Sequence, residues 1–108
     1  MPFAVFLTND AARDLDELYD YIALRYGRQK ADHVLEQVER AFSRLPEFPE
    51  RGAHPKELLA LGIREYREIF FKTYRIIYRV MDKKVYLLLI VDGHRDMQTL
   101  LQRRLLGG

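Results

Sequence analysis

The sequence contains no cysteine and no tryptophan, and it has only one serine, Ser43. Without cysteine, neither a disulfide framework nor a cysteine-ligated zinc or iron–sulfur site is possible. The three histidines lie far apart in the chain, so we expect neither a metal site nor a bound cofactor. A single serine inside an expected helix argues against a serine triad, and no glycine-rich phosphate loop is present.

Long apolar runs and a leader segment are also missing. The longest apolar run, Val85–Val91, is much shorter than the ~20 residues that cross a membrane. The first eight residues have no basic region ahead of an apolar core. We therefore expect a cytoplasmic protein without a membrane partner. Its 108 residues suit a single domain, 1–108, because a chain of this length can bury a core large enough to fold.

Charge is distributed unevenly along the chain. The formal net charge is +2. Residues 1–63 hold 8 basic and 11 acidic residues, a balance of −3, whereas residues 64–108 hold 10 basic and 5 acidic residues, a balance of +5. A basic C-terminal part suits a negatively charged partner, either nucleic acid or an acidic protein. A solvated basic surface without a partner is the alternative.

The N-terminal part has a strand pattern followed by helical periodicity. Phe3–Thr8 predicts a strand. Two helices follow, one ending at Gly27 and one over about Arg28–Leu45, each with apolar residues at helical spacing. Because almost nothing separates the two helices, they should form an antiparallel hairpin. The proline-rich loop Pro46–Pro55 comes next, and Lys56–Leu61 has room for one helical turn.

From residue 63 onward, strand-like alternation replaces the helical pattern. Three runs are joined by tight turns and should pair in antiparallel fashion, namely Arg64–Phe71, Thr73–Met81 and Val85–Val91. Asp96–Leu105 then predicts a terminal helix. The order is β-α-α-β-β-β-α, which predicts an α+β domain with a helical hairpin on one face of a small, mainly antiparallel sheet. The other face should be partly open and carry Arg75 and Arg79.

A cationic cluster is expected at one end of this sheet. Arg75 begins its strand, and His94 and Arg95 follow the last strand, so a hairpin brings all three to the same level. Two arginines and a histidine suit phosphate binding and stabilisation of a charged transition state, and a histidine transfers protons near neutral pH. The alternative is structural, with the arginines paired to acids such as Glu68 and the histidine hydrogen-bonded within a turn.

Three short motifs lie around these residues. They are Gly62–Glu65 (GIRE), Thr73–Val80 (TYRIIYRV) and Gly93–Asp96 (GHRD). With the leading strand and helical hairpin, they resemble the RelE/ParE superfamily of type II toxins over essentially the whole chain. The resemblance implies a toxin that a cognate antitoxin holds inactive in a hetero-oligomeric complex, with the C-terminal segment of the antitoxin wrapped around the toxin. An acidic segment would complement the basic half of this chain.

The branches of this superfamily act on different targets. RelE-like toxins cleave mRNA on the ribosome, whereas ParE-like toxins block DNA gyrase and have no established catalytic residues. In the nuclease branch, arginines matching Arg75 and Arg95 bind the phosphate, and both are present here. Lysines of that branch correspond to Tyr66 and Glu68, and its tyrosine on the terminal helix corresponds to Leu101. Three of the five elements therefore differ.

These differences favour a ParE-like gyrase inhibitor, which is a binding module rather than an enzyme. Its candidate contacts to the target are the basic residues Arg64, Arg67, Arg79, Arg103 and Arg104. The alternative is a ribosome-dependent endoribonuclease that uses Arg75 and Arg95 on the phosphate, with Glu68 or His94 transferring protons. A relative that binds an antitoxin but is no longer toxic is a third possibility.

Overall fold

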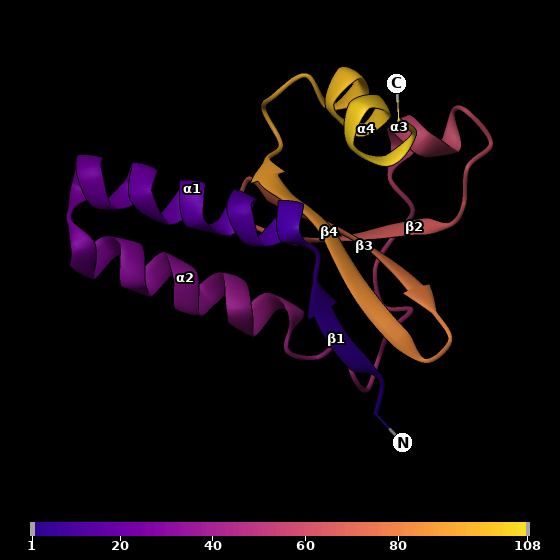
Figure 1. Ribbon diagram of the computed structural model, residues 1–108, viewed down its shortest axis with the longest axis horizontal. Coiled ribbons are helices and arrows are strands. Elements are labelled where there is room, and N and C mark those ends of the chain that lie inside the picture. Colours follow the sequence, from indigo (N-terminus) through magenta and orange to yellow (C-terminus); the bar gives the residue numbers. More distant parts are fainter. Residues whose placement is uncertain (1, 108) are drawn as a thin grey trace.

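A computed structural model describes residues 2–107 and confirms the predicted element order. The elements are β1 (Ala4–Leu7), α1 (Asn9–Tyr26), α2 (Arg28–Phe42), α3 (Lys56–Leu59), β2 (Tyr66–Phe71), β3 (Tyr74–Met81), β4 (Lys84–Asp92) and α4 (Met97–Leu105) (Figure 1). The short helix α3 is the single turn expected after the proline-rich loop. Among the described residues, no helix is both long and apolar enough to cross a membrane.

The four strands form one sheet in the order β1-β4-β3-β2. Strand β1 runs parallel to β4, and the other two pairs are antiparallel, so the sheet is mainly antiparallel as predicted. The β3–β4 turn places both Asp82 and Lys83 at positive φ, 50° and 62°. Two successive residues at positive φ are typical of the tight turns whose twist matches that of a β-hairpin. The turn therefore fixes the register of the two central strands.

The helical hairpin of α1 and α2 covers one face of the sheet. Thr8 begins α1, because its side-chain oxygen accepts a hydrogen bond from the Ala11 N–H at 3.1 Å. Gly27 separates the helices at φ 93°, a backbone conformation that glycine adopts easily. The hairpin and the sheet enclose the larger core, whose fully buried members include Ala31, Val38, Leu45, Ile76, Tyr78, Val85 and Leu87.

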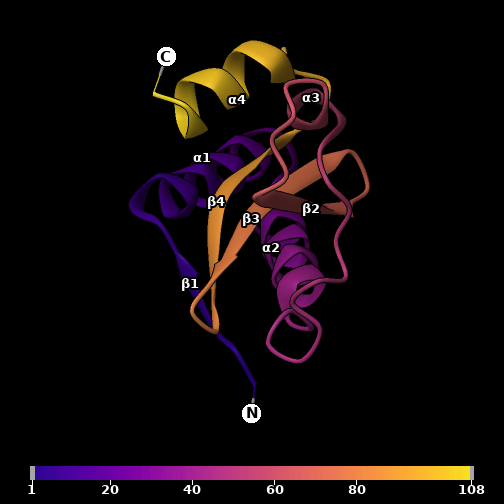
Figure 2. The ribbon, with the colours of Figure 1, turned by 90° about the vertical axis from the view of Figure 1, so that its right-hand side faces the viewer.

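The other face of the sheet has a smaller core of its own. Helices α3 and α4 lie close together at the end of the molecule away from the N-terminus (Figures 1 and 2). They pack on the sheet through a cluster that includes Leu58, Ile77, Leu89, Met97, Leu100 and Leu101. Arg75 lies on this face as expected, but only 7% of it is exposed. The expectation of an open face at this position is therefore wrong, because α3 folds over it.

Two element boundaries differ from the expected ones. Helix α2 ends at Phe42, and the next residues form turns that lead into the proline-rich loop. Strand β2 begins at Tyr66, two residues later than expected. The chain leaves α3 through a turn at Gly62, where φ is 75° and where the Ile63 N–H returns to the Leu58 carbonyl at 2.9 Å. Local turn chemistry, rather than hydrophobic pattern, sets both boundaries.

Candidate functional site

Arg75 is held between two glutamates on the second face of the sheet. Its Nη1 and Nη2 donate to the two carboxylate oxygens of Glu57, each at 2.8 Å, and its Nε donates to Oε1 of Glu68 at 2.7 Å. The side chains of these three residues are between 7% and 13% exposed. Glu57 comes from α3 and Glu68 from β2. Three separate elements therefore meet at one guanidinium group.

The electrostatics of this cluster follow from its burial and pairing. Hydrogen bonds from Arg75 lower the pKa of Glu57 below its ordinary value. Burial raises the pKa of Glu68, because desolvation outweighs the hydrogen bond that Arg75 donates. The hydrogen bond to Glu57 is the main reason that the pKa of Arg75 is raised. With all three groups ionised, two carboxylates surround one guanidinium, so the cluster does not present a free cation.

Close backbone contacts keep this cluster in place. A Cβ atom on Gly93 would lie 2.9 Å from Cδ of Arg75 and 3.0 Å from the Thr73 carbonyl oxygen. A Cβ on Gly52 would lie 2.6 Å from the Glu68 carbonyl oxygen. Both positions require the absence of a side chain, because real Cβ atoms do not approach other atoms so closely. The two glycines therefore let the chain pack against the strands that carry Arg75 and Glu68.

A solvent-accessible hollow of about 410 Å³ lies beside this cluster. Its lining comes from the end of the proline-rich loop, α3, strands β2 and β3, the turn between them and the turn after β4. The lining residues are His54, Lys56, Glu68, Phe70, Lys72, Thr73, Arg75, Gly93 and His94. The side chain of His94 is 78% exposed, with Nδ1 at 2.9 Å from Oδ1 of Asp92. Three of the predicted site residues thus share one hollow, namely Glu68, Arg75 and His94.

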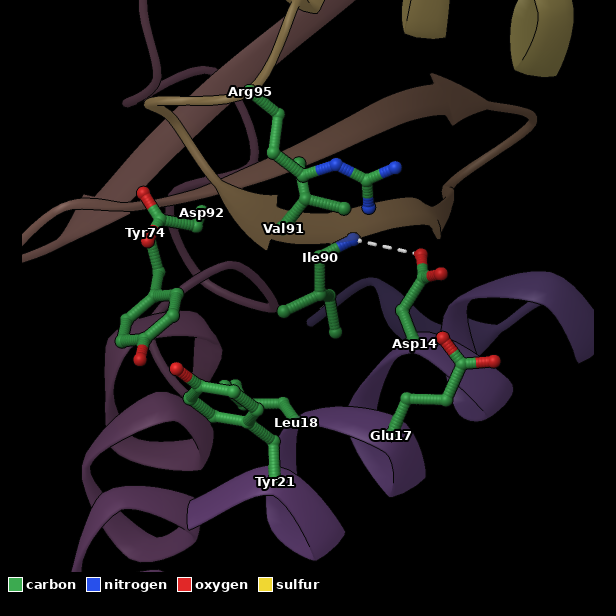
Figure 3. A pocket seen from close by; sticks show the side chains of 9 residues that line it. All are labelled: Asp14, Glu17, Leu18, Tyr21, Tyr74, Ile90, Val91, Asp92 and Arg95. Carbon is green, nitrogen blue, oxygen red and sulfur yellow. Dashed lines mark hydrogen bonds between the residues drawn. The ribbon is translucent and has the colours of Figure 1, made fainter. Parts of the chain in front are cut away.

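Arg95 does not join them. It lines a different cavity of about 420 Å³, between α1 and the ends of β3 and β4. Figure 3 shows Arg95 over Val91 and Ile90, with Tyr21 and Tyr74 on another side of the same cavity. Because Arg75 and Arg95 face different cavities, the structure does not bring the two arginines onto a common point.

The residues predicted to contact the target differ in whether their side chains already have partners within the fold. Arg67 donates to the backbone carbonyls of Glu50 and Gly52 at 3.1 and 2.8 Å, and the guanidinium of Arg79 lies 5.7 Å from the centre of the Tyr66 ring. Both therefore have structural partners. Within residues 2–107, the exposed residues Arg64 and Arg103 enter no ion pair and no side-chain hydrogen bond.

Arg104 contacts the edge of β4 beyond the point where β1 ends. Leu88 is an extra residue in the β3–β4 ladder, and its carbonyl accepts a hydrogen bond from Arg104 Nη2 at 3.0 Å. Arg104 also makes two hydrogen bonds to Asp14 at 3.0 and 2.9 Å, and Asp14 accepts from the Ile90 N–H at 3.1 Å. These contacts connect α1, β4 and α4 beyond the end of the short strand β1.

Two residues of these networks were not anticipated from the sequence. Glu57 lies in the one-turn helix α3, where nothing in its spacing distinguishes it from a solvent-exposed glutamate. Asp14 pairs with a residue 90 positions away, and no periodicity encodes such a pair. In the part of the chain that the structure describes, no group of three or more histidine, aspartate or glutamate side chains could hold a metal ion.

Comparisons with known proteins identify the family of this chain. The family model described as ParE toxin of type II toxin-antitoxin system, parDE, matches residues 5–97. Toxin ParE3 of Caulobacter vibrioides is 27% identical over 100 residues, which cover 93% of this chain and 96% of that protein.

Two solved structures have a similar fold. A chain of the chromosomal ParDE system from P. aeruginosa superposes with a TM-score of 0.71 at 24% identity, covering 83% of this chain and 95% of its own length. A chain of the RelBE2 toxin–antitoxin complex from Mycobacterium tuberculosis gives a TM-score of 0.58 at 28% identity, covering 85% and 99%. Because the family match extends from β1 to the start of α4, this chain belongs to the ParE toxin family of type II toxin–antitoxin systems, within the RelE/ParE superfamily.

Proposed function

We propose that this ParE-family toxin blocks DNA gyrase and that a cognate antitoxin neutralises it. The observation that favours gyrase over mRNA cleavage is the double hydrogen bond from Arg75 to Glu57, at 2.8 Å for each contact. A nuclease of this superfamily needs its arginines on the scissile phosphate. Here every nitrogen of the Arg75 guanidinium already contacts a carboxylate.

A phosphate would have to displace Glu57 to reach Arg75. Displacing Glu57 would break a nearly buried ion pair, and the phosphate would have to replace both hydrogen bonds that Arg75 now donates to Glu57. Arg95 cannot replace Arg75, because it faces the other cavity. The arrangement therefore supports a structural role for Arg75 and a toxin that acts by binding its target.

The contact surface for gyrase is the free part of the basic C-terminal half. Arg64 precedes β2 and Arg103 lies on α4, and both are exposed. Arg67, Arg79 and Arg104 contribute through the structures that they hold, rather than through direct contact. A surface of this kind attracts an acidic patch on a partner and speeds its association.

The antitoxin binds at a second, more apolar surface. A hollow of about 260 Å³ between the sheet and the end of α4 is lined by Thr8, Tyr66, Arg79, Met81, Tyr86, Leu88, Arg104 and Leu105. Nearby Phe6 and Leu106 are 45% and 41% exposed. Apolar side chains beside Arg79, which forms no ion pair within residues 2–107, suit an amphipathic segment with acidic residues along one edge.

The test is a supercoiling assay with purified gyrase and relaxed plasmid, run beside a cell-free translation assay. We expect the toxin to inhibit supercoiling and to leave mRNA intact on the ribosome. Arg64→Ala and Arg103→Ala should each weaken the inhibition, whereas Arg40→Ala, an exposed arginine of α2, should not. Ribosome-dependent mRNA cleavage that Arg75→Ala or His94→Ala abolishes would instead support the nuclease.

A further inference from the structure

The hollow beside Arg75 contains a hydrogen-bond acceptor with no partner. Glu68 is only 6% exposed, and both of its contacts with Arg75 use Oε1. Within residues 2–107, Oε2 of Glu68 accepts no hydrogen bond. No fully buried side-chain oxygen of the described residues lacks a partner, so Oε2 keeps some accessible surface, and Glu68 lines the hollow. A nearly buried carboxylate with one unpartnered oxygen therefore belongs to the lining of a space that a ligand can enter.

An aromatic surface lies beside this acceptor. Phe70 is two residues from Glu68 on β2, on the same face of the sheet, and it pairs across the ladder with Arg75. Phe70 lines the hollow and is 56% exposed. Exposed aromatic rings on a sheet are the platforms on which nucleic-acid bases stack. The lining of the hollow thus combines an exposed aromatic ring with a carboxylate that can accept hydrogen bonds.

Two lysines add positive charge to the lining of the hollow. Lys56 begins α3 and Lys72 lies in the β2–β3 turn, and both line the hollow. Neither forms an ion pair within the described part of the chain, although the Lys72 ammonium lies 5.6 Å from the centre of the Phe71 ring. His54 and His94 complete the rim. Two lysines beside an aromatic ring suit an anionic group attached to a flat ring.

We propose that this hollow binds one nucleotide unit without cleaving it. The base stacks on Phe70, an amino group of the base donates to Oε2 of Glu68, and the phosphate lies between Lys56 and Lys72. A volume of about 410 Å³ lies within the range of small-molecule sites. The nucleotide is not cleaved, because both terminal nitrogens of the Arg75 guanidinium donate hydrogen bonds to Glu57.

The acceptor makes the site selective among bases. Cytosine presents an amino donor where thymine presents a carbonyl oxygen. A carboxylate oxygen attracts the amino group of cytosine and repels the carbonyl oxygen of thymine. The two pyrimidines should therefore differ in affinity although they are of similar size. Cytosine nucleotides should therefore bind about tenfold more tightly than thymine nucleotides.

The experiment measures the binding of fluorescein-labelled (dC)6 and (dT)6 to the full chain, by anisotropy at low salt. We expect (dC)6 to bind about tenfold more tightly. Unlabelled CMP should displace it, because the site holds one nucleotide, and failure of CMP to compete would assign the binding to the strand backbone alone. Equal affinity for the two strands, or competition by inorganic phosphate as strong as by CMP, would overturn the proposal.

Matched variants separate stacking from general charge attraction. Phe70→Ala should weaken (dC)6 binding about tenfold. Phe48→Ala is the control, because Phe48 is also 56% exposed and lies in a different surface hollow. Glu68→Gln should reduce the preference for (dC)6 over (dT)6, a ratio that a general loss of stability would leave unchanged. An equal effect of the Phe70 and Phe48 variants would refute the site.

Discussion

Glu57 and Arg75 face each other through two parallel hydrogen bonds of 2.8 Å, one to each carboxylate oxygen. Eighteen positions of sequence separate them, and Glu57 lies in the first turn of α3, directly after the proline-rich loop. This pair is the reason that an arginine expected on an open surface is buried. The Glu57–Arg75 pair also attaches α3 to the sheet, so α3 belongs to the folded core.

The unfolding free energy should depend on pH because of the Glu57–Arg75 pair. Because the pKa of Glu57 is lowered from 4.5 in the folded protein, its ionised form stabilises the fold at pH values above 4.5. That stabilisation is lost as the pH falls through the lowered pKa. Wild type should therefore exceed Glu57→Gln in unfolding free energy at pH 7, and the difference should shrink below pH 4.5.

Urea unfolding at a series of pH values measures this difference. Glu65→Gln is the control, since Glu65 is exposed and lies outside the cluster. A difference between wild type and Glu57→Gln that stays constant down to pH 3 would show that the charge of Glu57 does not stabilise the fold. Glu68 acts in the opposite direction, because burial raises its pKa, so its ionised form lowers stability at neutral pH.

Removing Arg104 should destabilise the fold. Arg104→Ala takes away the partner of Asp14, whose side chain is 12% exposed, and the donor to the Leu88 carbonyl. We expect a loss of about 2–3 kcal/mol in unfolding free energy, below the full cost of breaking a buried pair because Arg104 is 18% exposed. Chemical denaturation with urea measures it.

The neighbouring arginine provides the control for that measurement. Arg103→Ala changes an exposed side chain on the same helix and should alter the unfolding free energy by less than about 0.5 kcal/mol. Equal losses for the two variants would mean that the contacts of Arg104 with Asp14 and Leu88 contribute nothing specific. The pair of variants also separates stability from target binding, which the exposed arginine is proposed to support.

A methyl group at position 93 should disturb the Arg75 cluster. Gly93→Ala places a carbon 2.9 Å from Cδ of Arg75 and 3.0 Å from the Thr73 carbonyl, so we expect a loss of about 1–3 kcal/mol from overpacking. In an Arg75→Ala background the side-chain clash disappears, and Gly93→Ala should cost less. Purely additive losses in this double-mutant cycle would contradict the contact.

The affinity for the antitoxin should depend on salt. Residues 64–108 carry a charge balance of +5, from 10 basic and 5 acidic residues, which an acidic antitoxin segment would complement. Raising the salt from ~50 to ~500 mM screens this attraction and should weaken binding and slow association. Titration calorimetry of the toxin with its antitoxin measures the effect, and a constant affinity over this range would rule out the electrostatic contribution.

The fold was predictable because its strongest signals are local. The helical spacing over α2 and the tight turns between β2, β3 and β4 determine most of the architecture, and Gly27 separates the helices where expected. The parallel pairing of β1 with β4 was not assigned from the sequence, since no local pattern specifies a partner so far along the chain.

The candidate site was only partly predictable for the same reason. The cross-strand register brings Arg75 level with Val91, as the hairpin implied, and Arg75 lines the same hollow as His94. The contact of Arg75 with Glu68 matches the structural alternative. The direction in which Arg95 points, and the approach of Glu57 from α3, depend on turns outside the strands. A pattern of alternating residues carries no information about such turns.

The pairing of β1 has a consequence for the order in which the molecule can form. Ala4 pairs with Lys84, so the first strand to be synthesised finds its partner only after all other strands exist. The helical hairpin forms earlier from local contacts, but its apolar face stays uncovered until β4 arrives. A nascent or truncated chain that ends before β4 therefore lacks the strand that pairs with β1 and covers much of α1, and it leaves part of the hairpin core exposed.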